Sequence, residues 1–337
     1  MHYLSRREVL AASISLLGAS SCHRWAFAAP EYPSRMAYVR EKQYQIVHTA
    51  EVTRSSLDSL EVWLPIPMDH PEQKISGLQI SPPVAILRDP GGQAAVAKAY
   101  FSRSVPPGQL FRMAASYVIT RREMSINKES VDKGQFKQYR INRQYRYFTR
   151  PERKIESSLP PIVMLAKRLR SQVKSPWQMA ADAYLWVVNH TKYQLVNGIK
   201  GAAFCLENGC GECGDWSALF VAICRAAGVP ARPVTGFWAD RTDEWHCWAE
   251  FMLPTGQWVP ADPTIGAQNK SKPQQYFGWL DNRRVSLCKT YDVLLPPSGG
   301  GQQSVDFLQV GAFWFSGGTA SAKFTAVGRE HPTVPAR

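Results

Sequence analysis

The chain has 337 residues, 45% hydrophobic and 20% charged, which are ordinary values for a globular protein and exclude wholesale disorder or a collagen-like repeat. Its formal net charge is +13, and removing residues 1–28, which carry three arginines and one glutamate, lowers it to +11. This excess favours encounters with anionic polymers or surfaces, but no nucleic-acid recognition motif accompanies it, so we expect no nucleic-acid partner.

The first residues have the pattern of an export signal. Arg6 and Arg7 precede an uncharged run from Val9 to Ser21, and Ala26-Phe27-Ala28 supplies a small-x-small cleavage site. Paired arginines directly before the apolar run are typical of twin-arginine signals, although an ordinary secretory signal is the alternative. We therefore predict a twin-arginine-type signal peptide over residues 1–28, the twin-arginine translocase as partner during export, and a periplasmic or secreted mature protein.

Cys22 is a candidate site of membrane attachment. Cys22 follows Ala19-Ser20-Ser21, and acylation of this cysteine would tether the protein, although the leucine usual in such signals is missing. Lipidation of Cys22 stays open. Beyond residue 30 no uninterrupted apolar run approaches 18 residues, so the sequence predicts no transmembrane span in the mature chain.

Short strands broken by proline and glycine are predicted from Tyr44 onward. Leu60, Val62 and Leu64 alternate with residues of the opposite face, and proline- and glycine-rich breaks recur at turn-like spacing. We predict an all-β, sandwich-like domain over residues 36–150. This region contains no combination of nucleophile, base and acid that suggests a site.

The periodicity changes after residue 150. Met179, Ala183 and Val187 recur at helical spacing, and residues 162–173 form another helix candidate. Strand patterns return at 234–238, 245–253 and 257–261. We therefore predict an α+β domain over residues 155–295, followed by a partly mobile C-terminal extension over residues 296–337.

A glycine- and cysteine-rich segment leads into the next predicted helix. Cys213 stands just before the helical stretch 218–227, which Gly228 and Pro230 end. At a helix start, the free backbone N–H groups and the helix dipole favour thiolate over thiol and provide donors to an oxyanion. These features predict that Cys213 is a nucleophile.

A base and an orienting carboxylate follow on two predicted strands. In the first strand, alternation places His246, Trp248 and Glu250 on one face. Asp262 ends the next strand, and the short turn between the two strands can bring its carboxylate beside the imidazole. The order and spacing suit a papain-type triad of Cys213, His246 and Asp262.

These motifs resemble the bacterial transglutaminase-like superfamily. The likeness covers about residues 160–295 and rests on Gly211-x-Cys213, the helix end Arg225–Arg232, His246-x-Trp248-Ala249-Glu250 and Asp262-Pro263-Thr264. It implies a papain-like core in which the helix bearing the nucleophile packs on an antiparallel sheet. It also implies attack by Cys213 on an amide carbonyl through a thioester acyl-enzyme, with no cofactor and no metal.

Together with the export signal, this chemistry predicts a peptide or protein substrate outside the cytoplasm, with cell-wall peptide as a candidate. We favour hydrolysis, as in a peptidase or amidase, because water is always available as an acceptor, and transfer to an amine, as in a transglutaminase, remains open. Trp216, Trp248 and Glu250 are candidate substrate-binding residues. Core packing of the tryptophans and a structural ion pair of Glu250 are the alternatives.

Two other functions remain open from the sequence. One is a non-catalytic module of the same fold that binds peptide or glycan. The other is a zinc site formed from Cys205, Cys210 and Cys213 with His246 and Cys247, although a second Cys-x-x-Cys is missing.

The cysteines near Cys213 offer two alternative disulfide bonds. In an oxidising compartment a Cys205–Cys210 bridge, which we prefer, would leave Cys213 free, whereas a Cys210–Cys213 bridge would mask it. We expect Cys224, Cys247 and Cys288 to be buried and to pack as small apolar side chains.

Overall fold

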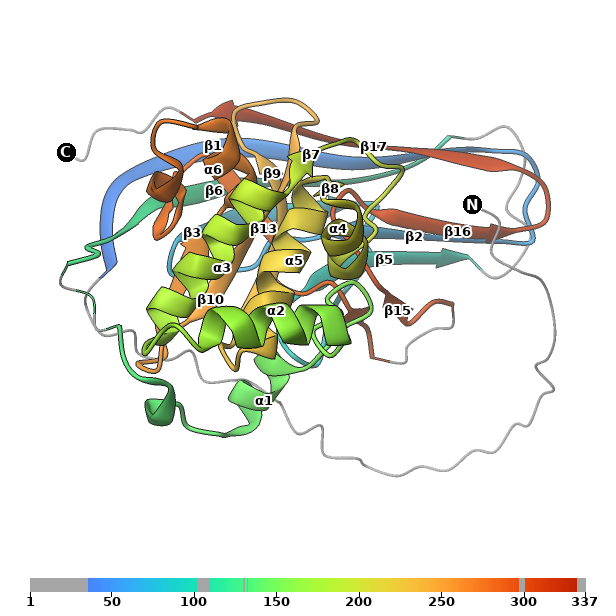
Figure 1. Ribbon diagram of the computed structural model, residues 1–337. Coiled ribbons are helices and arrows are strands. Elements are labelled where there is room, and N and C mark those ends of the chain that lie inside the picture. Colours follow the sequence, from blue (N-terminus) through green and yellow to red (C-terminus); the bar gives the residue numbers. More distant parts are fainter. Residues whose placement is uncertain (1–35, 102–109, 130, 132, 297–300, 332–337) are drawn as a thin grey trace, which may run out of the picture.

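The computed structural model describes residues 36–101, 110–129, 131, 133–296 and 301–331. The predicted signal peptide at residues 1–28, including Cys22, lies outside the described residues. The described residues form an α+β structure in which a β half and a helical half share one interface (Figure 1).

The β half is built from two antiparallel sheets. One has the strand order β12-β6-β1-β17, with β3 also paired to β6, and the other has the order β16-β2-β5-β4. Along β6 the buried and partly exposed side chains alternate, which turns Met113, Ala115, Tyr117 and Ile119 into the core between the sheets. The bounds of the strands are β1 (Met36–Arg54), β2 (Ser59–Pro65), β3 (Gln73–Ser81), β4 (Ala85–Arg88), β5 (Ala95–Phe101), β6 (Phe111–Ile126), β12 (Trp279–Leu280), β16 (Ala312–Ser316) and β17 (Ala320–Glu330).

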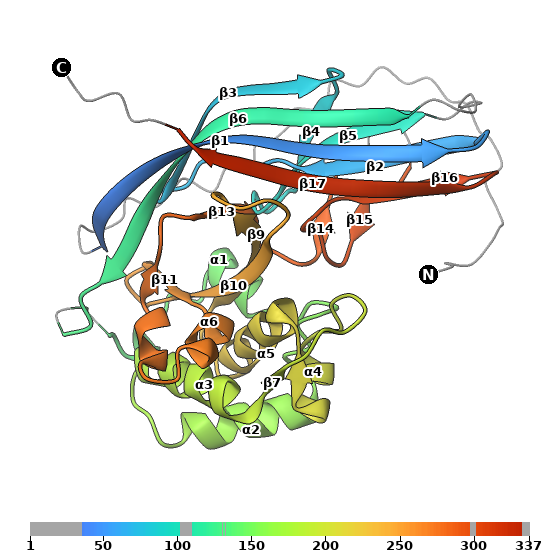
Figure 2. The same ribbon diagram turned by 90° about the horizontal axis from the view of Figure 1, so that it is seen from above.

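The helical half surrounds helix α5. Helices α2, α3 and α5 lie on one side of a four-stranded sheet of order β11-β10-β9-β13, and the β half lies on the other side (Figure 2). Helix α5 is apolar nearly all round, which fits its central position in this half. The bounds are α2 (Pro160–Arg170), α3 (Pro176–His190), α5 (Cys213–Ala226), β9 (Ala231–Trp238), β10 (Trp245–Met252), β11 (Trp258–Ala261) and β13 (Arg284–Cys288).

Shorter elements complete the chain. They are η1 (Phe136–Gln138), α1 (Arg143–Thr149), β7 (Lys192–Tyr193), α4 (Ala202–Asn208), β8 (Cys210–Gly211), α6 (Pro263–Gln268), η2 (Pro273–Tyr276), β14 (Val293–Leu294) and β15 (Ser304–Val305). Helix α1 lies within the residues predicted to be all-β. No helix in the described part of the chain is both long enough and apolar enough to cross a membrane.

The C-terminal strands differ from the sequence expectation. Residues 296–337 were predicted to be a partly mobile extension, but β16 pairs with β2, and β17 pairs with β1 over eleven residue positions. Strands β16 and β17 therefore complete the two sheets of the β half and do not form a separate extension. Residues 332–337 lie outside the described part.

Strand β17 also contacts the loop that precedes β10. The backbone N–H of Asp243 donates to the carbonyl of Ala326 at 2.9 Å, and the Asp243 carboxylate accepts from the Ala326 N–H at 2.8 Å. Gly328 lies so close to this loop that an added Cβ would be 1.8 Å from the Ala239 carbonyl oxygen. The C-terminal strand thus holds the loop that leads into the strand of His246.

Candidate active site

Cys213 is the first residue of α5, as the glycine-rich segment predicted. Glu212 and Asp215 form a reciprocal capping box, in which the Asp215 carboxylate accepts from the Glu212 N–H at 3.0 Å. Gly211 is required here, because an added Cβ would lie 2.7 Å from the Asp215 Cβ. At the first helical position the N–H of Cys213 has no partner within the helix, so it is available to an oxyanion.

The same two carboxylates fix the loop beside the nucleophile. Asp215 accepts from the N–H groups of Lys200 and Gly201 at 2.7 and 2.8 Å, and Glu212 accepts from that of Val196 at 2.8 Å. The loop therefore stays against the helix start. The Cys213 side chain remains half-buried and is not sealed off.

His246 and Asp262 meet across the β10–β11 hairpin. The imidazole Nε2 lies 2.7 Å from the Asp262 Oδ2, and the Asp262 Oδ1 caps helix α6 by accepting from the Ile265 N–H at 3.0 Å. The fully buried guanidinium of Arg284 donates to the same carboxylate and to Asp281 at 2.8 Å. Burial alone would raise the pKa of Asp262, but His246 and then Arg284 lower it to about 2.

The imidazole also contacts Cys213. Because Asp262 occupies Nε2, Nδ1 is left for the hydrogen bond with Cys213. The pKa of Cys213 is held well below its usual value by a hydrogen bond with the Cys247 thiol and by the hydrogen bond and charge of His246, which together outweigh burial. Burial opposes protonation of His246, but Asp262 and Cys213 raise its pKa to about 9. These directions favour a thiolate–imidazolium pair at neutral pH.

Two indole rings flank the imidazole. The His246 ring lies 5.7 Å from that of Trp238 at an interplanar angle of 28°, and 6.3 Å from that of Trp248 at 20°. The Arg284 guanidinium lies 5.1 and 5.5 Å from the same two indole centroids. These contacts restrict the orientation of the histidine and of the arginine that holds its carboxylate.

The structure places the three predicted substrate-binding residues away from solvent. Trp216 is 2% exposed in the core of the helical half, and Trp248 is 1% exposed. The Glu250 carboxylate pairs with Arg232 at 2.6 Å and Lys289 at 3.0 Å, and Lys289 continues to Glu72 of the β half at 2.7 Å. In this structure Glu250 joins the two halves through a buried ionic cluster.

The sequence reasoning missed Arg284, Tyr291 and the contact of Cys247 with the nucleophile. Arg284 begins a fully buried strand, and an arginine there needs a buried carboxylate, which was a usable signal. Tyr291 donates to the Gly214 carbonyl at 2.8 Å from a loop far along the chain. Nothing local in the sequence indicates that contact.

The six described cysteines are all free thiols, so the Cys205–Cys210 bridge is not formed in this structure. Cys205 is buried in α4, and Cys210 is half-buried on β8. Within the described ranges, no group of three or more His, Cys, Asp or Glu side chains is arranged to hold a metal ion.

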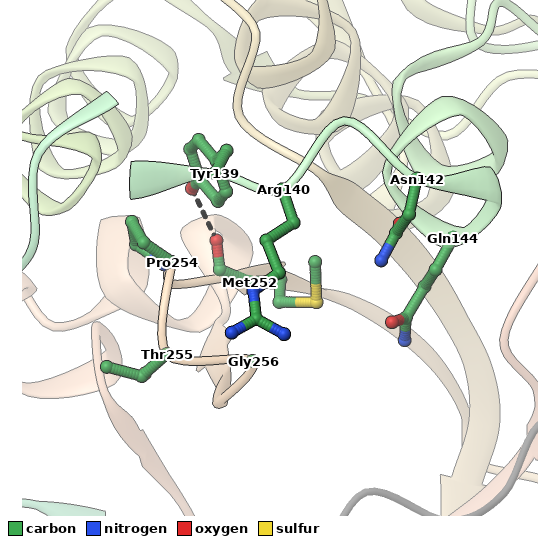
Figure 3. A pocket seen from close by; sticks show the side chains of 8 residues that line it. All are labelled: Tyr139, Arg140, Asn142, Gln144, Met252, Pro254, Thr255 and Gly256. Carbon is green, nitrogen blue, oxygen red and sulfur yellow. Dashed lines mark hydrogen bonds between the residues drawn. The ribbon is translucent and has the colours of Figure 1, made fainter. Parts of the chain in front are cut away.

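A separate cavity of about 410 Å³ opens at the other end of β10 (Figure 3). The Tyr139 hydroxyl donates to the Met252 carbonyl at 2.6 Å at this cavity, and Arg140 lies across it. Its lining residues are Tyr139, Arg140, Asn142, Gln144, Met252, Pro254, Thr255 and Gly256. His246 and Met252 are six residues apart along the strand, roughly 20 Å, so the triad takes no part in this cavity.

Comparison with known families locates the core. Residues 163–263 match the model of the transglutaminase-like superfamily, a range that contains Cys213, His246 and Asp262. The human peptide-N(4)-(N-acetyl-beta-glucosaminyl)asparagine amidase is 45% identical over 76 residues, which are 22% of this chain. The matched segment is only 10% of the human protein, so this chain shares a short part of that relative.

Solved structures show the wider fold. A protein of Cytophaga hutchinsonii named as a putative cysteine protease has a TM-score of 0.62 at 16% identity, covering 89% of this chain and 93% of that one. The periplasmic domain of TgpA from Pseudomonas aeruginosa has a TM-score of 0.33 at 18% identity, covering 64% of this chain and 72% of that one. The first likeness spans both halves, so the combination of β half and papain-like core is shared.

Proposed function

Because residues 163–263 form a core of the transglutaminase-like superfamily, we propose that this protein is a cysteine-nucleophile enzyme that transfers acyl groups from amides. One observation carries the proposal. Cys213 at the start of α5 is hydrogen-bonded to an imidazole whose other nitrogen lies 2.7 Å from the Asp262 carboxylate. This is the order of nucleophile, base and orienting acid that amide acyl transfer requires.

The contacts assign a role to each group. The Cys213 thiolate attacks the amide carbonyl, and the Cys213 N–H stabilises the oxyanion of the tetrahedral intermediate. The His246 imidazolium gives its proton to the leaving amine as the C–N bond breaks, which leaves a thioester on Cys213. His246 then takes a proton from water or an incoming amine, which attacks the thioester and releases the thiolate.

For the acyl acceptor and substrate we propose peptidase or amidase hydrolysis of an extracytoplasmic peptide or protein, cell-wall peptide included. The export pattern at Arg6-Arg7 and Ala26-Phe27-Ala28 supports this location. Transglutaminase-type transfer to an amine is the alternative outcome of the same thioester. Water competes at every turnover, so the ratio of the two products depends on access of an amine.

The test is to trap the acyl-enzyme. The purified protein is incubated with an activated acyl ester, with cell-wall peptides and with exported proteins, each with and without a labelled amine, and its mass is then measured. We expect one acyl group on Cys213, and release of free acid or of acyl-amine reports the acceptor.

Controls separate chemistry from non-specific labelling. Cys210→Ala removes a neighbouring half-buried thiol and should keep the adduct, whereas Cys213→Ala should abolish it. An adduct that persists in Cys213→Ala, or complete inertness of Cys213 toward the activated ester, would reject the proposed function.

A further inference from the structure

A second thiol lies against the nucleophile. Cys247 follows His246 on β10, and alternation turns its side chain to the face opposite His246, where α5 packs. It is completely buried, and its thiol is hydrogen-bonded to the thiol of Cys213. The mechanism above gives Cys247 no part in bond making or breaking.

The surrounding backbone explains how the two sulfur atoms meet. Strand β11 pairs with β10 only from Ala249 onward, so the backbone of Cys247 is uncovered on that side and donates its N–H to the Cys213 sulfur. Behind the pair, the Tyr291 hydroxyl contacts the Cys247 thiol and donates to the Gly214 carbonyl at 2.8 Å. Tyr291 in turn packs edge-on against Phe307, with ring centroids 5.0 Å apart.

Packing at the helix start limits the movement of the pair. An added Cβ on Gly214 would lie 2.4 Å from the Ile199 Cδ1 and 3.4 Å from the Tyr291 hydroxyl. The turn that carries Cys213 is therefore held between the 194–201 loop and Tyr291. Cys213 is half-buried, so part of it faces solvent, whereas Cys247 is completely buried.

We propose that Cys213 and Cys247 form a modification site for hydroperoxides, at which the nucleophile is converted reversibly into a Cys213–Cys247 disulfide. The proposal needs a reactive thiolate at Cys213 and the contact with Cys247, and it does not depend on which amide the protein cleaves. An exported protein meets an oxidising environment, in which an unprotected thiolate is oxidised irreversibly.

The reaction balances in two steps. The Cys213 thiolate attacks one oxygen of the hydroperoxide; a sulfur–oxygen bond forms, the oxygen–oxygen bond breaks, and hydroxide or alkoxide leaves and takes a proton. The Cys247 sulfur then attacks the sulfenic sulfur; the disulfide forms and the hydroxyl leaves with the Cys247 proton as water. Both sulfur atoms are oxidised and the peroxide is reduced. A dithiol reductant reverses the modification.

The other cysteines are less suited to this role. Cys224 and Cys288 are buried on α5 and β13, and Cys205 is buried in α4. Cys210 precedes the nucleophile on β8, and a bridge from it to Cys213 is the competing product. The test has to distinguish these two partners.

The experiment treats the reduced full-length protein with equimolar hydrogen peroxide and then blocks free thiols with iodoacetamide. Cleavage after Glu207, Glu212 and Glu244 separates Cys213 from Cys205, Cys210 and Cys247, and fragment ions of the linked peptide distinguish Cys213 from Cys224, so mass spectrometry can assign the bridge. We expect a Cys213–Cys247 link with loss of two hydrogens. We also expect Cys213 alkylation to fall more than about tenfold and to recover with a dithiol.

Two variants make the result decisive. In Cys247→Ala no Cys213–Cys247 disulfide can form, so a second equivalent of hydrogen peroxide, added to both proteins, should carry Cys213 from the sulfenic to the sulfinic acid, and recovery by dithiol should fall more than about tenfold relative to the wild type. Cys288→Ala, which removes a buried thiol on β13, should behave as the wild type. A dominant Cys210–Cys213 bridge, or equal loss of reversibility in the wild type and Cys247→Ala, would overturn the proposal. Because every readout is a mass or a labelling rate, failure of amide cleavage leaves this test unaffected.

Discussion

Strand β10 carries two buried ionic clusters on one face, four residues apart, and they differ in how completely their charges are paired. At Glu250, one carboxylate is held by two cations, Arg232 and Lys289, and the cluster continues into the β half through Glu72. At His246, the imidazole is held on one side by Asp262 and on the other by a half-buried thiol.

The difference separates a structural cluster from a reactive one. In the Glu250 cluster, every charged side chain has a partner of opposite charge within the protein, and no charged group is exposed. In the His246 cluster, the buried Asp262 carboxylate and the Arg284 guanidinium, which also pairs with the partly buried Asp281, fix the histidine, and the Cys213 thiolate is only half-buried. A substitution should therefore affect chemistry at one end of the strand and stability at the other.

The largest effect is expected at Cys213. Cys213→Ala removes the nucleophile, so the acyl-enzyme should be absent by mass spectrometry and turnover should disappear. The half-buried thiol is a small side chain, so the thermal midpoint should change little. Retained turnover in this variant would show that the reactive cluster lies elsewhere.

The next effect concerns the carboxylate that orients the histidine. Asp262→Asn keeps an acceptor for the Ile265 N–H but removes the charge beside the imidazole, so acylation should slow by about 10³ to 10⁴. Arg284 keeps Asp281 as a partner, so the fold should persist. Circular dichroism and pre-steady-state acylation together check this, and an unchanged acylation rate would contradict the orienting role.

A third prediction moves to the structural cluster. Glu250→Ala leaves Arg232 and Lys289 buried with less counter-charge, and we expect the free energy of unfolding to fall by about 3 to 5 kcal/mol. Denaturant unfolding measures this, while the pH dependence of Cys213 alkylation should not change. The matched control is Glu244→Ala at an exposed pair with Arg241, which should cost less than about 1 kcal/mol. Equal effects of the two variants would remove the distinction between the clusters.

The smallest effect is a change in pH dependence. The pKa of His246 is raised from 6.5 to about 9, so the imidazolium is retained through neutral pH and lost as pH rises through about 9. Amide turnover should therefore fall above pH 9, because the leaving amine loses its acid. Alkylation of Cys213 by iodoacetamide, which needs only the thiolate, should continue above pH 9 and persist well below the usual thiol pKa. Parallel decline of both rates above pH 9 would contradict this assignment.

Much of the helical half was predictable because the sequence patterns that determine its elements involve residues close together in the chain. The helix start at Cys213 follows from the glycine-rich segment and the helical run after it, and the hairpin that joins His246 to Asp262 follows from two short strands and a turn. The α+β class and the transglutaminase-like resemblance were confirmed.

The parts that were missed depend on long-range pairing. The ionic partners of Glu250 come from β9 and from the residue after β13, so they follow from strand register and not from neighbouring sequence. Similarly, no local pattern in residues 320–330 indicates β1 as their partner. These residues were predicted to be part of a mobile extension because they lie near the end of the sequence.

The pairing of β1 with β17 has a consequence for the order in which the protein can mature during synthesis. Tyr44 lies opposite Glu330, about 290 residues later, so the first sheet cannot close until the ribosome has made β17. The same late strand holds Asp243 in the loop before His246. Nascent chains that lack β17 should therefore contain helix α5, but their loop before His246 should lack the contacts with Ala326, which delays reactivity until β17 has been made.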